Sequence, residues 1–434
     1  MADYISRVTL MDAVRHVLVN AGPIAHLSSG DVNEPLRGHS MTDRELLVHE
    51  AGKGLVLEEG IVALITDSES IESEFGGDSS SNLNFIDLGG NAVLPGFVDC
   101  HTHLLWAGDR SNEMRLRQSG MNYQEIAEQG GGITKTVENT RLATSDDLMK
   151  EGARRVQSAL EHGTTSMECK SGYGLSLKSE LSLLEVIRDL QTQVDIKLHP
   201  TWLGAHDFPK NIPRKSYFEE LLTDQLPAIH EQGIAKWTDV FCEPGWYDLE
   251  QTEELVKASD KLGIASRLHV DEFKDGGGLA LASQLRAVSG DHVGYSSDEA
   301  RHAAEQNGTM QTFLPGTPYV LGKDLTLPLQ RCVEEAWRFS LATDFNPNCR
   351  SLSIPFVGSL ATHRMGLDPL AALVAVTRNP ATTLHDFEDR SIPGSLREGG
   401  PADLIIINST DVDGWCQTPG DNPVIQTFTS KSLL

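Results

Sequence analysis

Two histidines one residue apart, His101 and His103, follow the apolar stretch "VLPGFVDC". Residues i and i+2 of a strand point to the same side, so both imidazoles face one point. Neutral imidazoles are frequent ligands of zinc and iron. Taken alone, the pair fits a packing or surface role as well as it fits a metal site. It indicates a metal site only if other ligands converge on it.

Further polar side chains stand where later apolar segments end. They are His269 and Glu272 in "SRLHVDEF", His292 in "SGDHVG" and Asp344 in "LATDFNP". Each one alone fits a satisfied core histidine or a helix-capping aspartate. If the segments are parallel strands of one barrel, these side chains share its carboxyl-terminal face, where barrel active sites form.

The elements that would carry these residues are short apolar strands alternating with amphipathic helices. One such helix is "SDDLMKEGARRVQSALEH", with Ser145 as its expected N-cap. Strands buried on both faces and separated by helices predict an α/β fold, a (β/α)8 TIM-type barrel. The eight expected strands are residues 92–99, 164–168, 196–203, 239–242, 265–270, 287–291, 308–314 and 340–344.

Short β segments flank the barrel on both sides. Residues 46–91 contain "ELLVHEAGKGLVL", "GIVALITDS" and "NFIDLGG", with "SEFGGDSSSNLN" as a surface loop, and "GGPADLIIINST" lies near the other end. We expect them to join into one small β-sandwich. The predicted domains are 1–91 for its N-terminal part, 92–385 for the metal-dependent barrel and 386–434 for its C-terminal part.

Composition excludes several classes of protein. The net charge of −26 argues against a nucleic-acid partner, and no apolar run approaches a membrane span. The six cysteines form no C-x-x-C pair, which favours reduced thiols and a cytoplasmic location. The oligomeric state stays open, with a homodimer as one expectation.

The pattern of strand-end residues resembles the amidohydrolase superfamily, which carries His-x-His on strand one, His on strands five and six, and Asp on strand eight. Strand four, "TDVFCEPG", lacks the lysine that two-metal members carboxylate, and Lys170 belongs to strand two, which makes it a poor bridging ligand. The resemblance therefore implies one divalent ion, zinc or iron. Its implied ligands are His101, His103, His269 and Asp344.

Longer motifs are similar to the imidazolonepropionase family. They are "HTHLLWAGDR", "YQEIAEQGGGITKTV", "KSGYGL", "TWLGAH", "HVDEF", "LPGTPY" and "ATDFNP", and they run through all eight units. "KSGYGL" and "GGGITKT" are not general amidohydrolase features. The resemblance implies hydrolysis of the cyclic amide C–N bond of 4-imidazolone-5-propanoate to N-formimidoyl-L-glutamate, a step of histidine degradation.

The same resemblance assigns substrate contacts. Arg110 would pair with the propanoate, unless it only forms a surface ion pair with Asp109 or Glu113. The family usually continues "DFNPG" with Ser or Thr, whereas this chain has Asn348 in place of the glycine and Cys349 in place of the hydroxyl residue. Asn tolerates positive φ better than most residues, but the Cys thiol is a weak hydrogen-bond donor, which puts substrate contacts from this loop in doubt. The implied substrate-binding residues are Arg110, Tyr123, Tyr173, His206, Glu272, Asn346, Asn348 and Cys349.

Proton transfer is assigned to three residues without a single choice of base. Asp344 or His292 would take a proton from the attacking water, and His292 is also a candidate for stabilising the oxyanion. Glu272 would hold the ring and pass a proton to the leaving nitrogen.

Two other functions compete with this one. The first is a mononuclear aminohydrolase acting on another ring. The second is a catalytically silent scaffold of the dihydropyrimidinase type, which a metal assay would identify.

Overall fold

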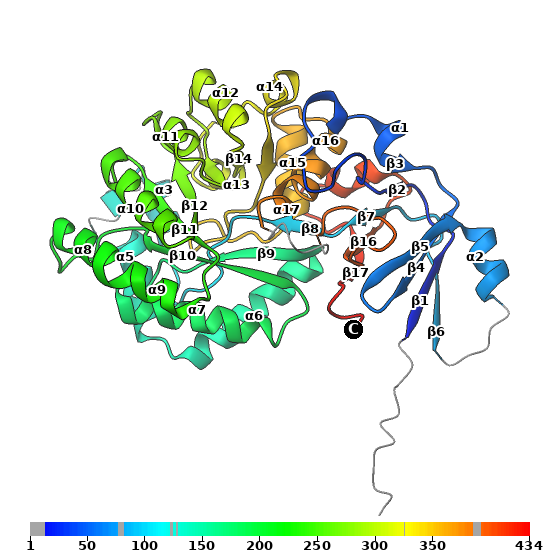
Figure 1. The fold of residues 1–434 in the computed structure, drawn as a ribbon, viewed down its shortest axis with the longest axis horizontal. Coiled ribbons are helices and arrows are strands. Elements are labelled where there is room, and N and C mark those ends of the chain that lie inside the picture. Colours follow the sequence, from blue (N-terminus) through cyan, green and yellow to red (C-terminus); the bar gives the residue numbers. More distant parts are fainter. Residues whose placement is uncertain (1–13, 77–81, 122–124, 127–128, 325, 385–391) are drawn as a thin grey trace, which may run out of the picture.

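Eight parallel strands form the larger sheet of the computed structural model, and Figure 1 shows how they are arranged. The structure describes residues 14–76, 82–121, 125–126, 129–324, 326–384 and 392–434. Neighbours in the sheet follow chain order from β8 to β15, which confirms the predicted TIM-type barrel. The strands are β8 Phe97–Asp99, β9 Thr164–Lys170, β10 Lys197–Ala205, β11 Trp237–Cys242, β12 Ala265–Val270, β13 Ser289–His292, β14 Met310–Phe313 and β15 Phe339–Leu341.

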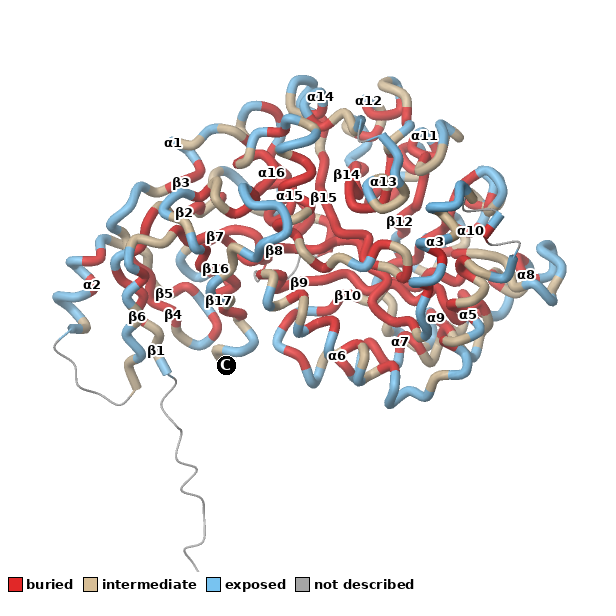
Figure 2. The backbone as a smooth tube through the Cα atoms, turned by 180° about the vertical axis from the view of Figure 1, so that it is seen from behind, coloured by how far each residue is buried: buried red, intermediate tan, exposed pale blue. Residues whose placement is uncertain are grey.

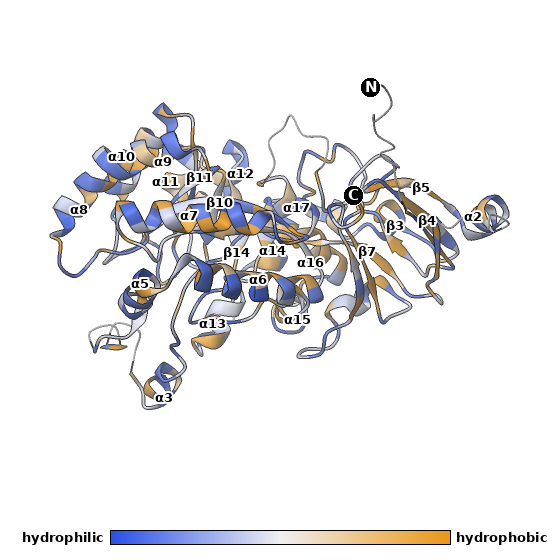
Figure 3. Cartoon of the chain, turned by 90° about the horizontal axis from the view of Figure 1, so that it is seen from below, coloured by the Kyte–Doolittle hydropathy of each residue, from blue (hydrophilic) through white to orange (hydrophobic). Residues whose placement is uncertain are grey.

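Helices cover the outside of this sheet. Figure 2 shows the strands buried and the outer turns of the helices exposed, and Figure 3 shows both hydrophobic and hydrophilic residues on α6 and α7. No helix within the described ranges is long and apolar enough to span a bilayer. The helices are α3 Glu113–Gln118, α5 Gly132–Leu142, α6 Ser145–Glu161, α7 Leu177–Gln191, α8 Arg214–Glu220, α9 Leu226–Gln232, α10 Leu249–Lys261, α11 Gly278–Gln284, α12 Asp298–Asn307, α13 Gly316–Val320, α14 Leu329–Glu334, α15 Ile354–His363, α16 Pro369–Ala375 and α17 Arg378–Ala381.

The N-cap predicted for α6 was wrong by one residue. Ser145 is the first helical residue, and Thr144 is the N-cap. The Thr144 hydroxyl accepts from the Asp147 amide at 3.1 Å and donates to the Asp147 carboxylate at 2.7 Å, so the two residues satisfy each other. Ser145 offers the same hydroxyl, but the reciprocal pairing requires Asp147 three residues after the cap.

We expect Thr144→Ala to lower the free energy of unfolding by about 0.5–2 kcal/mol, because it removes this cap. Urea unfolding measures the change. Ser145→Ala is the matched control and should be close to neutral. A larger loss in Ser145→Ala than in Thr144→Ala would contradict the assignment.

The first predicted strand, residues 92–99, is divided between two sheets. β7, Val93–Pro95, pairs with β16 of the smaller domain, whereas β8 begins at Phe97 in the barrel. Gly96 lies between them, and a Cβ at this position would stand 2.3 Å from the Thr165 side chain. Its amide donates to the Asp403 carbonyl at 2.9 Å. A side chain here would block the crossing, so Gly96 permits the change of sheet.

The smaller domain combines both ends of the described chain. Its two sheets have the orders β5-β4-β1-β6 and β17-β16-β7-β2-β3, so β16 and β17 join strands that precede the barrel, as predicted. Its elements are β1 Arg15–Val19, β2 Ile24–Ala25, α1 Arg44–Leu47, β3 Val48–His49, β4 Lys53–Glu58, β5 Ile61–Asp67, α2 Ser68–Phe75, β6 Leu83–Asp87, β7 Val93–Pro95, β16 Leu404–Ile407 and β17 Val424–Phe428.

Three details of the flanking segments differ from the sequence analysis. The β character expected from residue 46 onward missed β1 and β2, and part of "ELLVHEAGKGLVL" is the helix α1, capped by the Asp43 side chain. The predicted loop 73–84 begins inside α2, and residues 77–81 lie outside the described part. The domain boundaries stay a prediction, since residues 385–391 also lie outside it.

The barrel closes between β8 and β15 through the residues that follow each strand. The Asp99 carboxylate accepts from the Thr343 hydroxyl at 2.6 Å. Beyond the strands, the Asp344 amide donates to the His101 carbonyl at 3.2 Å, and the His103 amide to the Phe345 carbonyl at 2.8 Å. The seam therefore brings the His-x-His segment beside Asp344.

Candidate active site

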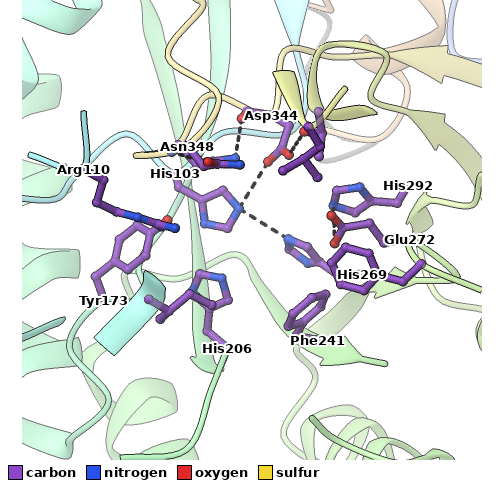
Figure 4. A pocket seen from close by; sticks show the side chains of 15 residues that line it. His103, Arg110, Tyr173, His206, Phe241, His269, Glu272, His292, Asp344 and Asn348 are labelled. Carbon is purple, nitrogen blue, oxygen red and sulfur yellow. Dashed lines mark hydrogen bonds and ion pairs between the residues drawn. The ribbon is translucent and has the colours of Figure 1, made fainter. Parts of the chain in front are cut away.

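A cluster of imidazoles and one carboxylate lies at the carboxyl-terminal end of the barrel (Figure 4). Possible ligand atoms of His101, His103 and His269 all lie within 4.8 Å of one another, as do those of His101, His292 and Asp344. Figure 4 shows His103, His269, His292 and Asp344 of this cluster. The Asp344 carboxylate is 3.6 Å from Nε2 of His101 and 3.6 Å from Nε2 of His103. The structure thus brings together the four ligands predicted from the sequence.

Two further carboxylates contact the Nδ1 atoms of two of these imidazoles. Asp291 Oδ2 lies 2.7 Å from Nδ1 of His101, and Asp239 Oδ1 lies 3.1 Å from Nδ1 of His269. A carboxylate at Nδ1 favours the tautomer with hydrogen on that nitrogen, which leaves the lone pair of Nε2 directed into the cluster. Burial lowers the pKa of His101 and of His103 well below the usual value, so both rings are neutral.

These side chains fit a divalent cation. Nε2 of His269 and Nε2 of His103 face each other at 3.4 Å, and Nε2 of His101 has no hydrogen-bond partner among the described residues. Burial raises the pKa of Asp344 to about 6, because removal from water disfavours the charged carboxylate. A cation would engage these lone pairs and stabilise the carboxylate, which matches the chemistry of zinc and iron sites.

A cavity opens from this cluster, and small molecules bind preferentially in such concave sites. Cys349 is absent from its lining, and its Sγ lies 3.7 Å from the Thr343 carbonyl. Tyr123 lies outside the described residues. The lining residues are His103, Arg110, Ile133, Tyr173, His206, Phe241, His269, Glu272, Phe273, His292, Thr317, Leu321, Asp344, Asn346 and Asn348.

Arg110 stands in the cavity wall and forms an ion pair there. Its Nε and one Nη donate to the two carboxylate oxygens of Glu113 at 2.9 and 2.8 Å. Arg110 is 6% exposed and Glu113 1%, so the pair is buried rather than on the surface. Glu113 also accepts from the Gly132 amide at 2.9 Å, which ties the guanidinium to the start of α5.

Tyr173 and His206 form a second wall. The His206 ring stacks on His103 with centroids 5.0 Å apart, and the Tyr173 ring lies 5.1 Å from His206. Nδ1 of His206 lies 3.0 Å from the carbonyl of Gly172, whose φ of 94° favours glycine. Burial lowers the pKa of His206 to about 3, so this ring is neutral.

Glu272 and His292 face each other across the cavity from His103. Glu272 Oε2 and His292 Nε2 are 3.7 Å apart, beyond hydrogen-bond distance. Burial raises the pKa of Glu272 well above its usual value and lowers that of His292, which favours the neutral form of each. Glu243, at the end of β11, accepts from the Glu272 amide and fixes its position.

In the loop after β15, Asn346 forms hydrogen bonds within the loop and Asn348 binds a residue outside it. Asn346 accepts from the Asn348 amide at 2.8 Å and from the Cys349 amide at 3.0 Å, and Asn348 accepts from Arg117. Asn348 does not use its tolerance of positive φ, whereas Asp344, with φ of 50°, has the left-handed backbone in this segment.

His292 and Asp344 both adopt backbone conformations that non-glycine residues avoid. Their φ angles are 73° and 50°, and Asp271, next to Glu272, has φ of 53°. Each such residue costs on the order of 1–3 kcal/mol and persists only where the surroundings fix it. Asp271 is fixed by the Gly276, Gly278 and Leu279 amides and the Ser296 hydroxyl, which bind its carboxylate. Two of these three residues, His292 and Asp344, contribute their side chains to the cluster.

Sequence reasoning missed the residues that support the cluster. Asp239 and Asp291 hold two histidines, and Thr317 donates a hydrogen bond to Asp344. Asp291 directly precedes His292 and Asp239 lies inside strand four, so polar residues inside otherwise apolar strands were the available signal. Lys170, expected to be a poor metal ligand, contacts carboxylates instead.

Comparisons with a family model and with individual relatives both place the chain among the amidohydrolases. The amidohydrolase family model matches residues 84–142. The imidazolonepropionase of Symbiobacterium thermophilum is 37% identical over 404 residues, 92% of each chain, and that of Haloarcula marismortui is 36% identical over 378 residues, 86% of this chain and 88% of the relative.

Solved structures support the fold. Ochratoxinase of A. niger aligns with a TM-score of 0.67 at 17% identity, covering 97% of this chain and 95% of that one. 5-Methylcytosine deaminase of Klebsiella pneumoniae aligns with a TM-score of 0.69 at 16% identity, covering 96% and 97%.

Proposed function

The chain belongs to the imidazolonepropionase family, and on that premise we propose that it hydrolyses 4-imidazolone-5-propanoate to N-formimidoyl-L-glutamate in histidine degradation. The observation that carries the proposal is the similarity over nine-tenths of the chain to an imidazolonepropionase. The cavity supports it chemically, because it combines a cluster of metal-binding type with an arginine suited to a carboxylate.

We propose one divalent ion, zinc or iron, as the cofactor. His101, His103, His269 and Asp344 would hold it, as the convergence of their ligand atoms suggests. When bound, such an ion activates water and polarises a carbonyl group. Glu168 and Asp239 lie against Lys170 Nζ, which favours an ammonium group over a carbamate at this position. Without a carbamate to bridge two ions, a single ion fits the site.

The remaining cavity residues would orient the substrate and move protons. Tyr173 and His206 offer an aromatic wall for the imidazolone ring, and Arg110 offers its guanidinium to the propanoate. Glu272, held neutral by burial, is able to donate a proton to the leaving nitrogen. His292, also neutral, is able to accept one from water or to stabilise the developing oxyanion.

The direct test is loss of the ultraviolet absorbance of 4-imidazolone-5-propanoate with purified protein, together with identification of the product. Hydrolysis without ammonia release fits the proposal, because ring opening retains both nitrogens. Ammonia release from a different ring would instead favour an aminohydrolase. Metal-free protein without turnover on any ring would favour the scaffold.

Arg110 tests the identity of the substrate. A charged hydrogen bond contributes about 1.5–3 kcal/mol, so we expect Arg110→Ala to lower kcat/KM roughly ten- to hundred-fold. An imidazolone without the carboxylate should show the same loss with the unmodified enzyme and little further loss with the variant. Equal damage to both substrates would make Arg110 structural.

Removing Arg110 also leaves Glu113 buried without its partner, which is costly in itself. We would therefore repeat the comparison in Glu113→Gln protein. Arg115→Ala, an exposed arginine on α3, is the matched control and should leave kcat/KM unchanged.

We also propose a cytoplasmic location and a homodimeric state. The six cysteines are all free and buried, which suits a reducing compartment. Cell fractionation and light scattering would test these two proposals.

A further inference from the structure

Lys170 lies at the end of β9 with its ammonium group enclosed by carboxylates. Its side chain is 0% exposed, and Nζ is 2.8 Å from Glu168 Oε1 and 2.7 Å from Asp239 Oδ2. Asp291 Oδ2 is 3.9 Å away. One buried cation therefore serves acidic side chains from β9, β11 and β13.

Two of these carboxylates are the ones that hold the imidazole cluster. Asp239 contacts Nδ1 of His269, and Asp291 contacts Nδ1 of His101. Oδ2 of Asp291 is the atom nearest both to His101 and to Lys170. The contacts thus run from one lysine through two aspartates to two of the proposed ligands.

We propose that Lys170 is a positioning residue of the metal site: its ammonium group holds Asp239 and Asp291 so that these keep His269 and His101 oriented with Nε2 toward the ion. The inference rests on the metal site of the proposed function and not on its substrate.

The physical reason is the cost of buried charge. Asp239 and Asp291 are both 0% exposed, and buried like charges repel each other strongly unless a cation lies between them. Without the ammonium group, this repulsion would displace the two carboxylates, and the Nδ1 atoms of His269 and His101 would lose the contacts that orient the rings. Burial alone would lower the pKa of Lys170, but Asp239 and Glu168 outweigh it and raise the value above its usual one.

A role for Lys170 as a carbamate ligand is chemically opposed by the same neighbours. A carbamate is an anion, and it would face Glu168 and Asp239, which now form ion pairs with the ammonium group. The geometry therefore assigns Lys170 to support of the ligands rather than to the metal itself.

The test is the metal affinity of Lys170→Met, measured without substrate by competition with a chromogenic chelator. Loss of such supporting contacts typically weakens metal binding about 10–100-fold, and we expect a change of that size. The absorption spectrum of the cobalt-substituted variant should also change, because the imidazoles are no longer fixed. Arg378→Met is the matched control: Arg378 is also buried, binds backbone carbonyls of Leu27 and Ser29, and should leave the metal affinity unchanged.

A second comparison separates positioning from general stability. In Asp239→Asn/Asp291→Asn protein, Lys170→Met should weaken metal binding by less than two-fold further, because its path to the ligands is already removed. If Lys170→Met does not fold, Asp239→Asn alone decides, and it should weaken binding about 10-fold or more.

Unchanged metal affinity in the folded Lys170→Met protein would overturn the inference, and so would an equal loss of affinity in both backgrounds. If Lys170→Met does not fold, unchanged metal affinity in Asp239→Asn protein would overturn it. Because substrate is absent from these measurements, such a result would leave the proposed reaction standing. A failed turnover assay with intact metal binding would have the opposite meaning.

Discussion

Replacing His101 by alanine is expected to remove the metal ion and abolish turnover while the barrel stays folded. His101 belongs to both groups of convergent ligand atoms, so its loss disrupts the cluster more than the loss of any peripheral contact. Without the ion, water keeps a pKa near 15.7 instead of about 7, and hydrolysis at neutral pH stops. Elemental analysis, circular dichroism and the ultraviolet assay measure the three outcomes.

The same elemental analysis tests the number of ions. Unmodified protein should contain about one zinc or iron per chain, because the two groups of convergent ligand atoms share His101 and form one cluster. His162→Ala is the matched control, since His162 contacts the Ser158 carbonyl at the end of α6. Two ions per chain, or a full ion in His101→Ala, would contradict the proposed site.

Changing Glu272 to glutamine or His292 to alanine should leave the ion in place and remove most turnover. General acid–base groups contribute typically ~10²–10⁴-fold, and we expect a loss in that range for each variant. The reason is their position: both line the cavity, 3.7 Å from each other and beside the cluster. Steady-state kinetics and elemental analysis of the same preparations give the result.

Glu250→Gln is the control for Glu272, because Glu250 is an exposed carboxylate in the first turn of α10 and should have no effect. Loss of metal from either active-site variant would make that residue a ligand. Full activity in Glu272→Gln would leave the leaving nitrogen without its proposed proton donor.

The barrel and the ligand types could be predicted from the sequence by itself. Apolar strands with polar residues at their carboxyl ends predict a parallel barrel with a site at one face, because those ends meet wherever such a barrel closes. This rule places His101, His103, His269, Glu272, His292 and Asp344 at one face, and the resemblance to the amidohydrolases then selects His101, His103, His269 and Asp344 as the ligands. Helices such as α6 were predictable for a similar local reason, to within one residue at the cap.

Only the tertiary structure decided what holds those ligands. His101 and Asp291 are 190 residues apart, and their contact depends on how β13 lies relative to β8 inside the closed barrel. The burial of Arg110 against Glu113, the left-handed backbone of His292 and the lysine between two aspartates are likewise absent from any local pattern. Local propensity selects strands and helices, whereas the partner of a buried charge is selected by the charges that packing places around it.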